Sequence, residues 1–194
     1  MPPKPKFTKE EIVAAALKLV SEQGMEALTA RNLGMRLGSS ARPIFTVFRS
    51  MEEVQQEVRV AAMRRFEAFI SGGKDDAPAF KRFDIQMVRF AVEEPKLYQL
   101  LFMTENEVAR SIDDVFASLG DTARLSLELI QAAYRLDGEQ ARILFRQIWI
   151  YTFGIGALCA AKVCHFSEEE ISRMLSQAFA GALLLVKSGG SLSD

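Results

Sequence analysis

The sequence predicts an all-α protein of about nine helices, in which a three-helix unit of the helix-turn-helix type precedes a larger helical body. Apolar residues recur at three- and four-residue intervals along most of the 194 residues. Ser or Thr residues followed three positions later by Glu recur as capping boxes, which mark helix starts. No segment alternates apolar and polar side chains as a half-buried strand does. With 49% hydrophobic residues, the chain has ample material for a buried core.

The first helix is predicted over Lys9–Gln23. Thr8 and Glu11 form a capping box at its start, and Gly24 is placed to stop it. Ile12, Ala16 and Leu19 recur at helical spacing, so one face of this helix should be buried.

Two shorter helices follow. Thr29 is the N-cap candidate of a helix over Ala30–Leu37, which should end at Gly38. After a tight turn, Ser40 can cap a third helix over Ala41–Phe48. Pro43 falls in the first turn of that helix, where a missing N–H breaks no intrahelical hydrogen bond.

A long fourth helix opens with a capping box at residues 50–53 and should run to about Ile70. Residues 72–78 are rich in Gly and charge and end in Pro78, so they indicate a linker. Helical patterns then continue to the end of the chain. They cover 79–93, a segment beginning at Pro95, 107–134 with an interruption at Gly120, 139–161, and 168–187.

These patterns predict four parts. Residues 1–50 form a helix-turn-helix domain and residues 51–71 a connecting helix; residues 72–188 form a helical body, and 189–194 a disordered tail.

Charge and composition narrow the function classes. Residues 1–50 carry eight basic and four acidic side chains, a net charge of +4, whereas the remainder carries sixteen basic and twenty-one acidic ones, a net charge of −5. This distribution fits a protein that touches a polyanion with one end only. Two cysteines and a polar, proline-broken start favour the reducing cytoplasm. Residues 147–161 are uncharged but too few to span a bilayer, so we expect a buried helix and no membrane.

The second and third helices can cross as a helix-turn-helix, with the third in the major groove of double-stranded DNA. Arg42 can contact a guanine edge, while Arg31 and Arg49 are better placed for phosphates. The predicted DNA-contacting residues are Thr29, Arg31, Ser40, Ala41, Arg42, Pro43, Phe45, Thr46 and Arg49.

Residues 29–54, TARNLGMRLGSSARPIFTVFRSMEEV, resemble the N-terminal signature of TetR-family regulators. The resemblance implies a DNA-binding transcriptional regulator that is not an enzyme, with a C-terminal ligand-binding and dimerisation domain. It also implies a repressor that a ligand releases from its operator by acting through the fourth helix. Phe45 stands where the family has a phosphate-contacting tyrosine, and Met51 where it has a lysine, so two polar contacts are missing.

One helix-turn-helix reads few base pairs, so specificity requires a homodimer on a palindromic operator. Small residues on the last two predicted helices allow close helix approach, although the same residues also suit a monomer core. The resemblance implies that these two helices form the dimer interface. The predicted interface residues are Gly154, Ala157, Ala161, Ala178, Gly181, Ala182 and Leu185.

Large apolar groups between linker and interface can line a ligand cavity or fill a core. If they line a cavity, the ligand is a small apolar or aromatic molecule, with Arg89, Arg146, Gln147 or Tyr151 as orienting groups. The predicted ligand-contacting residues are Phe66, Phe83, Met87, Phe90, Leu101, Phe102, Phe145, Trp149 and Phe153.

Two other function classes stay open. Cys159, Cys164 and His165 lie close in sequence and permit a redox or metal sensor, although they match no strong zinc spacing. A helical binding protein whose helix-turn-helix has lost its DNA target also fits, given Phe45 and Met51. No catalytic or nucleotide-binding motif is present, so we expect neither catalytic residues nor a cofactor or metal.

Overall fold

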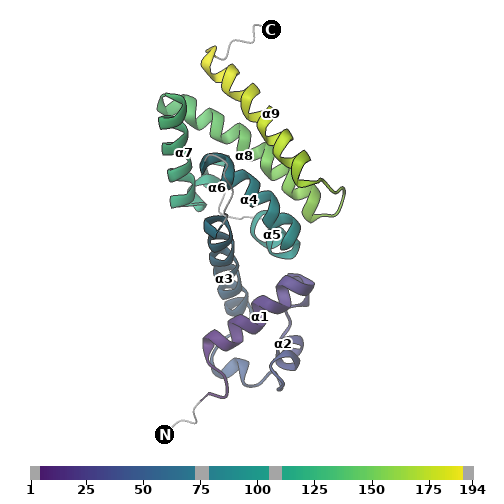
Figure 1. The fold of residues 1–194 in the computed structure, drawn as a ribbon. Coiled ribbons are helices and arrows are strands. Elements are labelled where there is room, and N and C mark those ends of the chain that lie inside the picture. The colour runs from purple at the N-terminus through teal and green to yellow at the C-terminus, as the bar shows by residue number, and fades with distance from the viewer. Residues whose placement is uncertain (1–4, 73–78, 105–110, 190–194) are drawn as a thin grey trace. The chain divides into compact units, whose positions relative to one another are not determined.

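The computed structural model describes residues 5–72, 79–104 and 111–189. Within these ranges the regular structure consists of nine α-helices and two short 3-10 helices (Figure 1), which confirms the all-α prediction. By its internal contacts the chain divides into two compact units. The first comprises residues 1–71 and 93–104, and the second residues 72–92 and 105–194. The domain limits expected from the sequence stay a prediction.

The first unit holds four α-helices and both 3-10 helices. They are α1 (Lys9–Gln23), η1 (Met25–Ala27), α2 (Ala30–Arg36), η2 (Ile44–Thr46), α3 (Met51–Gly72) and α5 (Pro95–Phe102). Its core is apolar and fully buried, with Ile12 and Ala16 of α1, Leu33 of α2, and Val54 and Val58 of α3 at its centre. These residues recur at three- and four-residue spacing, which is why the amphipathic pattern located the helices.

The capping signals explain where α1 begins and ends. The hydroxyl of Thr8 accepts a hydrogen bond from the backbone N–H of Glu11 (3.2 Å), and the Glu11 carboxylate accepts one from the N–H of Thr8 (2.8 Å). Gly24 ends the helix with a φ of +88°, a conformation that L side chains rarely adopt. The predicted bounds of this helix are confirmed.

The third predicted helix, Ala41–Phe48, is wrong. Its residues form turns around the three-residue 3-10 helix η2, in which hydrogen bonds join each N–H to the carbonyl three residues earlier. The Thr46 hydroxyl donates to the carbonyl of Pro43 at 2.6 Å, so it competes for the same acceptor as a backbone N–H. Pro43 and the β-branched residues after it also lower the helix propensity of so short a segment.

The second unit holds five α-helices. They are α4 (Ala79–Glu93), α6 (Ile112–Ser118), α7 (Asp121–Tyr134), α8 (Gly138–Ala160) and α9 (Glu168–Lys187). α8 packs against both α7 and α9. Figure 1 shows α8 and α9 running side by side, and Val88 of α4, Ile155 of α8 and Leu175 of α9 share one buried cluster. Sequence patterning located these helices to within a residue, except for the predicted segment 107–134.

That segment is interrupted as the sequence suggested. Gly120 separates α6 from α7 with a φ of +55°. Residues 107–110 of the predicted segment lie outside the described residues, as do 73–78 of the predicted linker and most of the predicted disordered tail.

One described helix, α8, is long and apolar enough to cross a membrane by length and composition alone. Half of its most apolar window is buried inside the second unit. Its apolar side chains, including Leu144, Ile148 and Ile155, belong to the core, so its hydropathy needs no membrane.

Candidate functional site

The segment from α2 to η2 is a tightly folded turn. The backbone N–H of Ser39 donates to the carbonyl of Gly34 at 2.9 Å, which brings the chain back against α2. A Cβ at Gly34 would lie only 2.8 Å from the backbone carbon of Ser40 and 2.9 Å from the nitrogen of Ala41. The turn therefore requires glycine at residue 34, and it holds the residues after α2 in one position against that helix.

Three arginines on this segment are available to bind phosphate. Arg31 on α2 and Arg42 and Arg49 on either side of η2 are exposed, and none makes an ion pair with another described residue. Phe45 between them leaves 47% of its surface exposed. This exposed set is suited to contacting a nucleic-acid backbone and apolar base edges.

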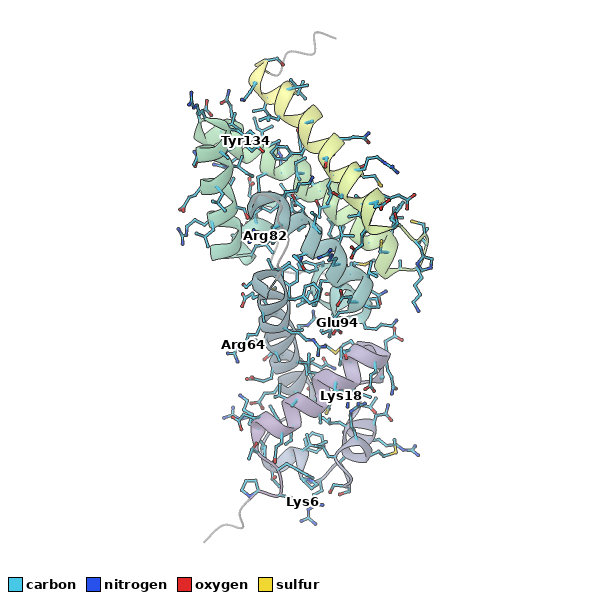
Figure 2. The ribbon with its side chains drawn as sticks, in the orientation of Figure 1. Lys6, Lys18, Arg64, Arg82, Glu94 and Tyr134 are labelled. Carbon is cyan, nitrogen blue, oxygen red and sulfur yellow. The ribbon has the colours of Figure 1, made fainter. Side chains whose placement is uncertain are left out.

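Several other cations of the first unit have partners. Arg36 binds Glu22 with two hydrogen bonds of 2.7 Å, and this pairing lowers the pKa of the Glu22 carboxyl. Lys9 binds Glu57 at 2.6 Å. Lys6, labelled in Figure 2, donates to the hydroxyl of Ser39 at 3.0 Å and so places its positive charge beside the turn. Lys6 and the three arginines therefore place positive charge around the turn.

The remaining predicted DNA-contacting residues have mixed roles. Thr29 is exposed, and its hydroxyl caps α2 by accepting from the N–H of Asn32 at 3.2 Å. Ser40 and Thr46 are exposed, whereas Ala41 and Pro43 are half-buried. The structure thus brings the predicted set together on one short segment, although on turns and not on a helix. Their contacts with DNA stay a prediction.

The predicted ligand-contacting residues divide between the two units. Phe66 of α3 and Phe102 of α5 lie in the first unit, with ring centroids 5.0 Å apart. Leu101 of α5 is half-buried there. The other predicted residues belong to the second unit, so the predicted set does not form a single cluster within either one.

An aromatic cluster lies in the second unit. Phe116 of α6 packs edge-on against Phe145 and Trp149 of α8 at centroid distances of 5.0 and 5.2 Å, and Trp149 stacks on Phe153 at 5.4 Å. Phe83, Met87 and Phe90 of α4 are also buried in this unit. These residues form core packing, and a role in ligand binding stays a prediction.

Two cavities adjoin the aromatic cluster. A groove of about 210 Å³ is lined by residues of α6, α7 and α8, among them Phe116, Leu127 and Arg146. A smaller, more enclosed cavity of about 10 Å³ lies among residues of α4, α7, α8 and α9, including Phe83 and Asp84. Phe145 lines both cavities.

Asp84 is the group that the sequence interpretation missed. Burial raises the pKa of its carboxyl to about 7, and a hydrogen bond from the hydroxyl of Thr152 (3.2 Å) works in the opposite direction. Its burial could have been inferred from its position in the sequence. Asp84 falls beside Phe83 and one turn before Met87 and Val88 on the apolar face of α4.

The four predicted orienting groups have different surroundings. Arg146 lines the groove, and the Arg89 guanidinium binds Glu168 at 3.2 Å. Gln147 and Tyr151 are exposed on α8. Only Arg146 among these four lines the groove or the enclosed cavity.

The predicted dimer residues lie on α8 and α9. Gly154, Ala157 and Ala161 recur on one face of α8 with the exposed Ile150 and Leu158, and a Cβ added at Gly154 would meet nothing within 4 Å. On α9, Gly181 is exposed and equally open, and Leu184 beside it is 72% exposed. Ala178, Ala182 and Leu185 are half-buried.

The cysteines give little support to a sensor site. Cys159 is buried in the α8–α9 core, and its burial, with Cys164 nearby, raises the pKa of the Cys159 thiol. A raised pKa lowers the thiolate fraction, which is the reactive form. Among the described residues, no three His, Cys, Asp or Glu side chains are grouped closely enough to hold a metal ion.

Comparisons with known proteins show what the N-terminal sequence and the fold resemble. Residues 12–58 match the model of the bacterial regulatory proteins of the tetR family. No curated protein matches the sequence.

Solved structures match the fold of almost the whole chain. A TetR-family transcriptional regulator from Vibrio parahaemolyticus aligns with a TM-score of 0.59 over 89% of this chain and 96% of its own. A transcriptional regulator from Rhodococcus sp. Rha1 gives 0.56 over 90% and 95%, and the fatty acid degradation regulator FadR from Bacillus halodurans gives 0.51 over 94% and 97%. Each is 16% identical to this chain, so these comparisons show a shared fold and nothing more.

The matched residues 12–58 include most of α1, the whole α2–η2 turn and the start of α3. They therefore include the turn held by Gly34 and the three exposed arginines. Proteins of this family are DNA-binding transcription factors and not enzymes. In its matched N-terminal sequence and in its overall fold, the chain is similar to TetR-family transcriptional regulators.

Proposed function

We propose that this regulator is a cytoplasmic repressor that binds a palindromic operator as a homodimer and is released by a small apolar ligand. The observation that carries the proposal is the exposed set of Arg31 on α2 and of Arg42 and Arg49 on either side of η2, none of which makes an ion pair with another described residue. Guanidinium groups that lack a protein partner are suited to phosphate oxygens and to the O6 and N7 atoms of guanine.

The exposed face of α8 and α9 supports dimerisation. Leu184, Leu158 and Ile150 are 72%, 41% and 51% exposed, and burying them against a second copy would remove a large apolar surface from water. Gly154 and Gly181 leave open space beside them, so another helix can approach closely. An isologous interface of this kind produces the two-fold symmetry that a palindromic operator mirrors.

The groove between α6, α7 and α8 supports a ligand. Its volume of about 210 Å³ is small beside typical ligand sites, but Phe116 and Phe145 in its wall belong to an aromatic cluster whose rings can rearrange. A ligand that fits the protein better in its DNA-free conformation would shift the population away from the DNA-bound form.

The proposal is tested by binding the full chain to a pool of random duplexes at two salt concentrations and sequencing the retained fraction. A recovered palindrome whose half-sites are about one helical turn apart supports a dimeric repressor, and it supplies the operator. Weaker retention at the higher salt is expected, because phosphate contacts release counterions. Weak binding with no motif at either salt would instead favour a helical binding protein without a DNA target.

Repression needs a second measurement. With the recovered operator placed across a promoter, the protein should lower transcription in a purified system. A rise in transcription on adding the protein would make it an activator, and contradict the repressor part alone.

A further inference from the structure

Asp84 is the most unusual polar side chain of the second unit. It is 8% exposed in a core of apolar residues, and its one hydrogen bond in the described structure comes from the hydroxyl of Thr152. A carboxylate has about four sites that can accept hydrogen bonds, so most of the acceptor capacity of Asp84 is unused. A buried acid group of this kind is costly for the core, and that cost requires a physical explanation.

The surroundings of Asp84 suit a bound molecule. It lines the enclosed cavity with Phe83, Ile130, Ile148 and Phe179 from four different helices. Apart from Ser126 the other lining residues are apolar, and Asp84 is the one titratable group among them. At about 10 Å³ the cavity has room for about one water molecule, so a larger occupant requires a side chain to move.

Phe145 is the side chain in the right place to move. Its ring lies between the enclosed cavity and the outer groove, because it lines both of them. It contacts Phe116 edge-on at 5.0 Å, an arrangement that allows a change of rotamer without breaking a polar contact. With the ring displaced, the groove would open onto the carboxyl of Asp84.

We propose that Asp84 anchors the ligand of this regulator, and that this ligand is a hydrophobic amine. The amine enters from the groove between α6, α7 and α8, displaces the ring of Phe145 and donates a hydrogen bond from its ammonium group to the Asp84 carboxylate. This inference rests on the proposal that the helical body senses a small molecule, and it specifies the chemistry of that molecule.

The amine follows from charge and hydrogen bonding. An ammonium group brings three donors and a positive charge, which together compensate the burial of the carboxylate. A ligand acid would place a second negative charge beside Asp84, and an alcohol would supply a donor without charge. The outer groove should favour neither cations nor anions, because its charged lining residues are two acids and two bases: Asp113, Glu139, Arg142 and Arg146. Discrimination between ligands should therefore come from Asp84.

Three probes with one apolar body test the proposal in the full chain. These are 4-phenylbutylamine, 4-phenylbutanol and 4-phenylbutyrate, titrated against the fluorescence of Trp149. Trp149 is the only tryptophan of the chain and packs against Phe116 and Phe153 within the aromatic cluster. The amine should bind at least tenfold more tightly than the alcohol, and the acid more weakly than both. Equal binding of the three probes, or no binding by any of them, would overturn the proposal.

Matched variants identify the responsible carboxyl. Asp84→Asn keeps the shape of the side chain and should remove the preference for amine over alcohol, whereas Glu139→Gln in the groove should leave it intact. Thr152→Val removes the hydroxyl that donates a hydrogen bond to Asp84 but leaves the carboxyl in place, so this variant should still bind the amine more tightly than the alcohol. Thermal unfolding of each variant establishes that it is folded. Loss of the preference in Glu139→Gln but not in Asp84→Asn would assign the binding to the outer groove and contradict the proposal.

The outcomes also separate this inference from the proposed function. Selection of an operator by a protein that shows no amine preference would overturn the amine inference alone. Conversely, an amine preference that depends on Asp84, in a protein that selects no DNA motif, would overturn the operator-binding proposal alone.

Discussion

At the scale of single residues, Arg42 and Arg49 are chemically alike and equally unpaired, yet they precede and follow η2 and should contribute differently. We expect Arg42→Ala to change which duplex sequences are selected, because Arg42 is the candidate for contact with a guanine edge. We expect Arg49→Ala to weaken binding evenly across sequences and to lower the salt slope by about 1, as loss of one phosphate contact does. Fluorescence anisotropy at several salt concentrations, on several duplexes, measures both effects.

The control for the arginine series is Arg64→Ala. Arg64 is an exposed arginine of α3, outside the turn, and is labelled in Figure 2. Its loss should leave both the sequence preference and the salt slope close to those of the parent protein. If Arg42→Ala and Arg49→Ala weakened binding to every duplex by the same factor, Arg42 would have no role in reading bases.

Asp84 should make the stability of the protein depend on pH in the direction opposite to most acids. Burial raises its pKa from the ordinary value of 3.8 to about 7 in the folded state, so between these values the folded protein binds more protons than the unfolded chain. The stabilisation of the folded state that comes from protonated Asp84 is therefore fully present below about pH 4, and it is lost as the pH rises through 7. The loss can reach about 4 kcal/mol.

Urea unfolding at a series of pH values from 5 to 8 measures this effect. Asp84→Asn does not titrate, so relative to the parent protein it should become progressively more stable as the pH rises and level off above 7. Asp113→Asn, which changes an exposed aspartate of α6, is the control and should follow the parent curve. A constant difference between Asp84→Asn and the parent at every pH would contradict the raised pKa.

At the scale of elements, capping and amphipathic patterns predicted α1, α4 and α9 with their observed bounds. Two of these begin at capping boxes whose four hydrogen bonds form within a few residues, so the information is local. The candidate DNA-binding residues could be named from the sequence because they follow one another closely along the chain, and their contacts with DNA stay a prediction. Asp84 and Thr152 were not recognised as a pair, since 68 residues separate them and only packing brings α4 against α8.

The error at residues 41–48 has a different cause. The sequence contains a capping serine, a proline in the first turn and inward-facing Ile44 and Phe48, all of which suit a short helix. Both apolar residues are indeed buried. The turns satisfy the same burial pattern, because the backbone N–H of Phe48 donates to the carbonyl of Ile44 at 2.9 Å and so sets the two residues one helical turn apart without a continuous α-helix. Hydrophobic spacing over eight residues cannot separate the two structures.

Gly34 offers a test of the turn between α2 and η2. Gly34→Ala should destabilise the first unit by about 1–3 kcal/mol, because its Cβ would lie within 3.0 Å of the backbone of Ser40 and Ala41. Since the backbone must shift at the segment proposed to contact DNA, DNA binding should fall more than the loss of stability explains. Urea unfolding and anisotropy on the same preparation measure the two effects.

Gly72→Ala provides the matched control, because a Cβ there would meet nothing within 4 Å. It should change neither stability nor DNA binding measurably. Parent-like DNA binding by Gly34→Ala would mean that the approach of α2 to the turn does not position the contacting residues.

At the scale of the whole molecule, a single turn motif with three available arginines is a small reading surface. Two copies joined through α8 and α9 would double the phosphate contacts and the length of sequence that is read. The exposed leucines on that face then have a purpose that a monomer does not provide, since a solvated Leu184 contributes nothing to the core. A variant that no longer dimerises should therefore also lose its tight binding to the full palindromic operator.

Leu184→Glu tests this link. Placing a charge on the α8–α9 face should produce a monomer at micromolar concentration in sedimentation equilibrium, because burial of an unpaired carboxylate is strongly unfavourable. Affinity for a palindromic duplex should fall at least tenfold, while affinity for a single half-site stays unchanged. Leu125→Glu alters a leucine of α7 that is 50% exposed, and should leave both the mass and the affinity unchanged. A Leu184→Glu protein that remained dimeric with parent-like operator affinity would move the interface away from this face, because an unpaired carboxylate buried there would strongly destabilise the dimer.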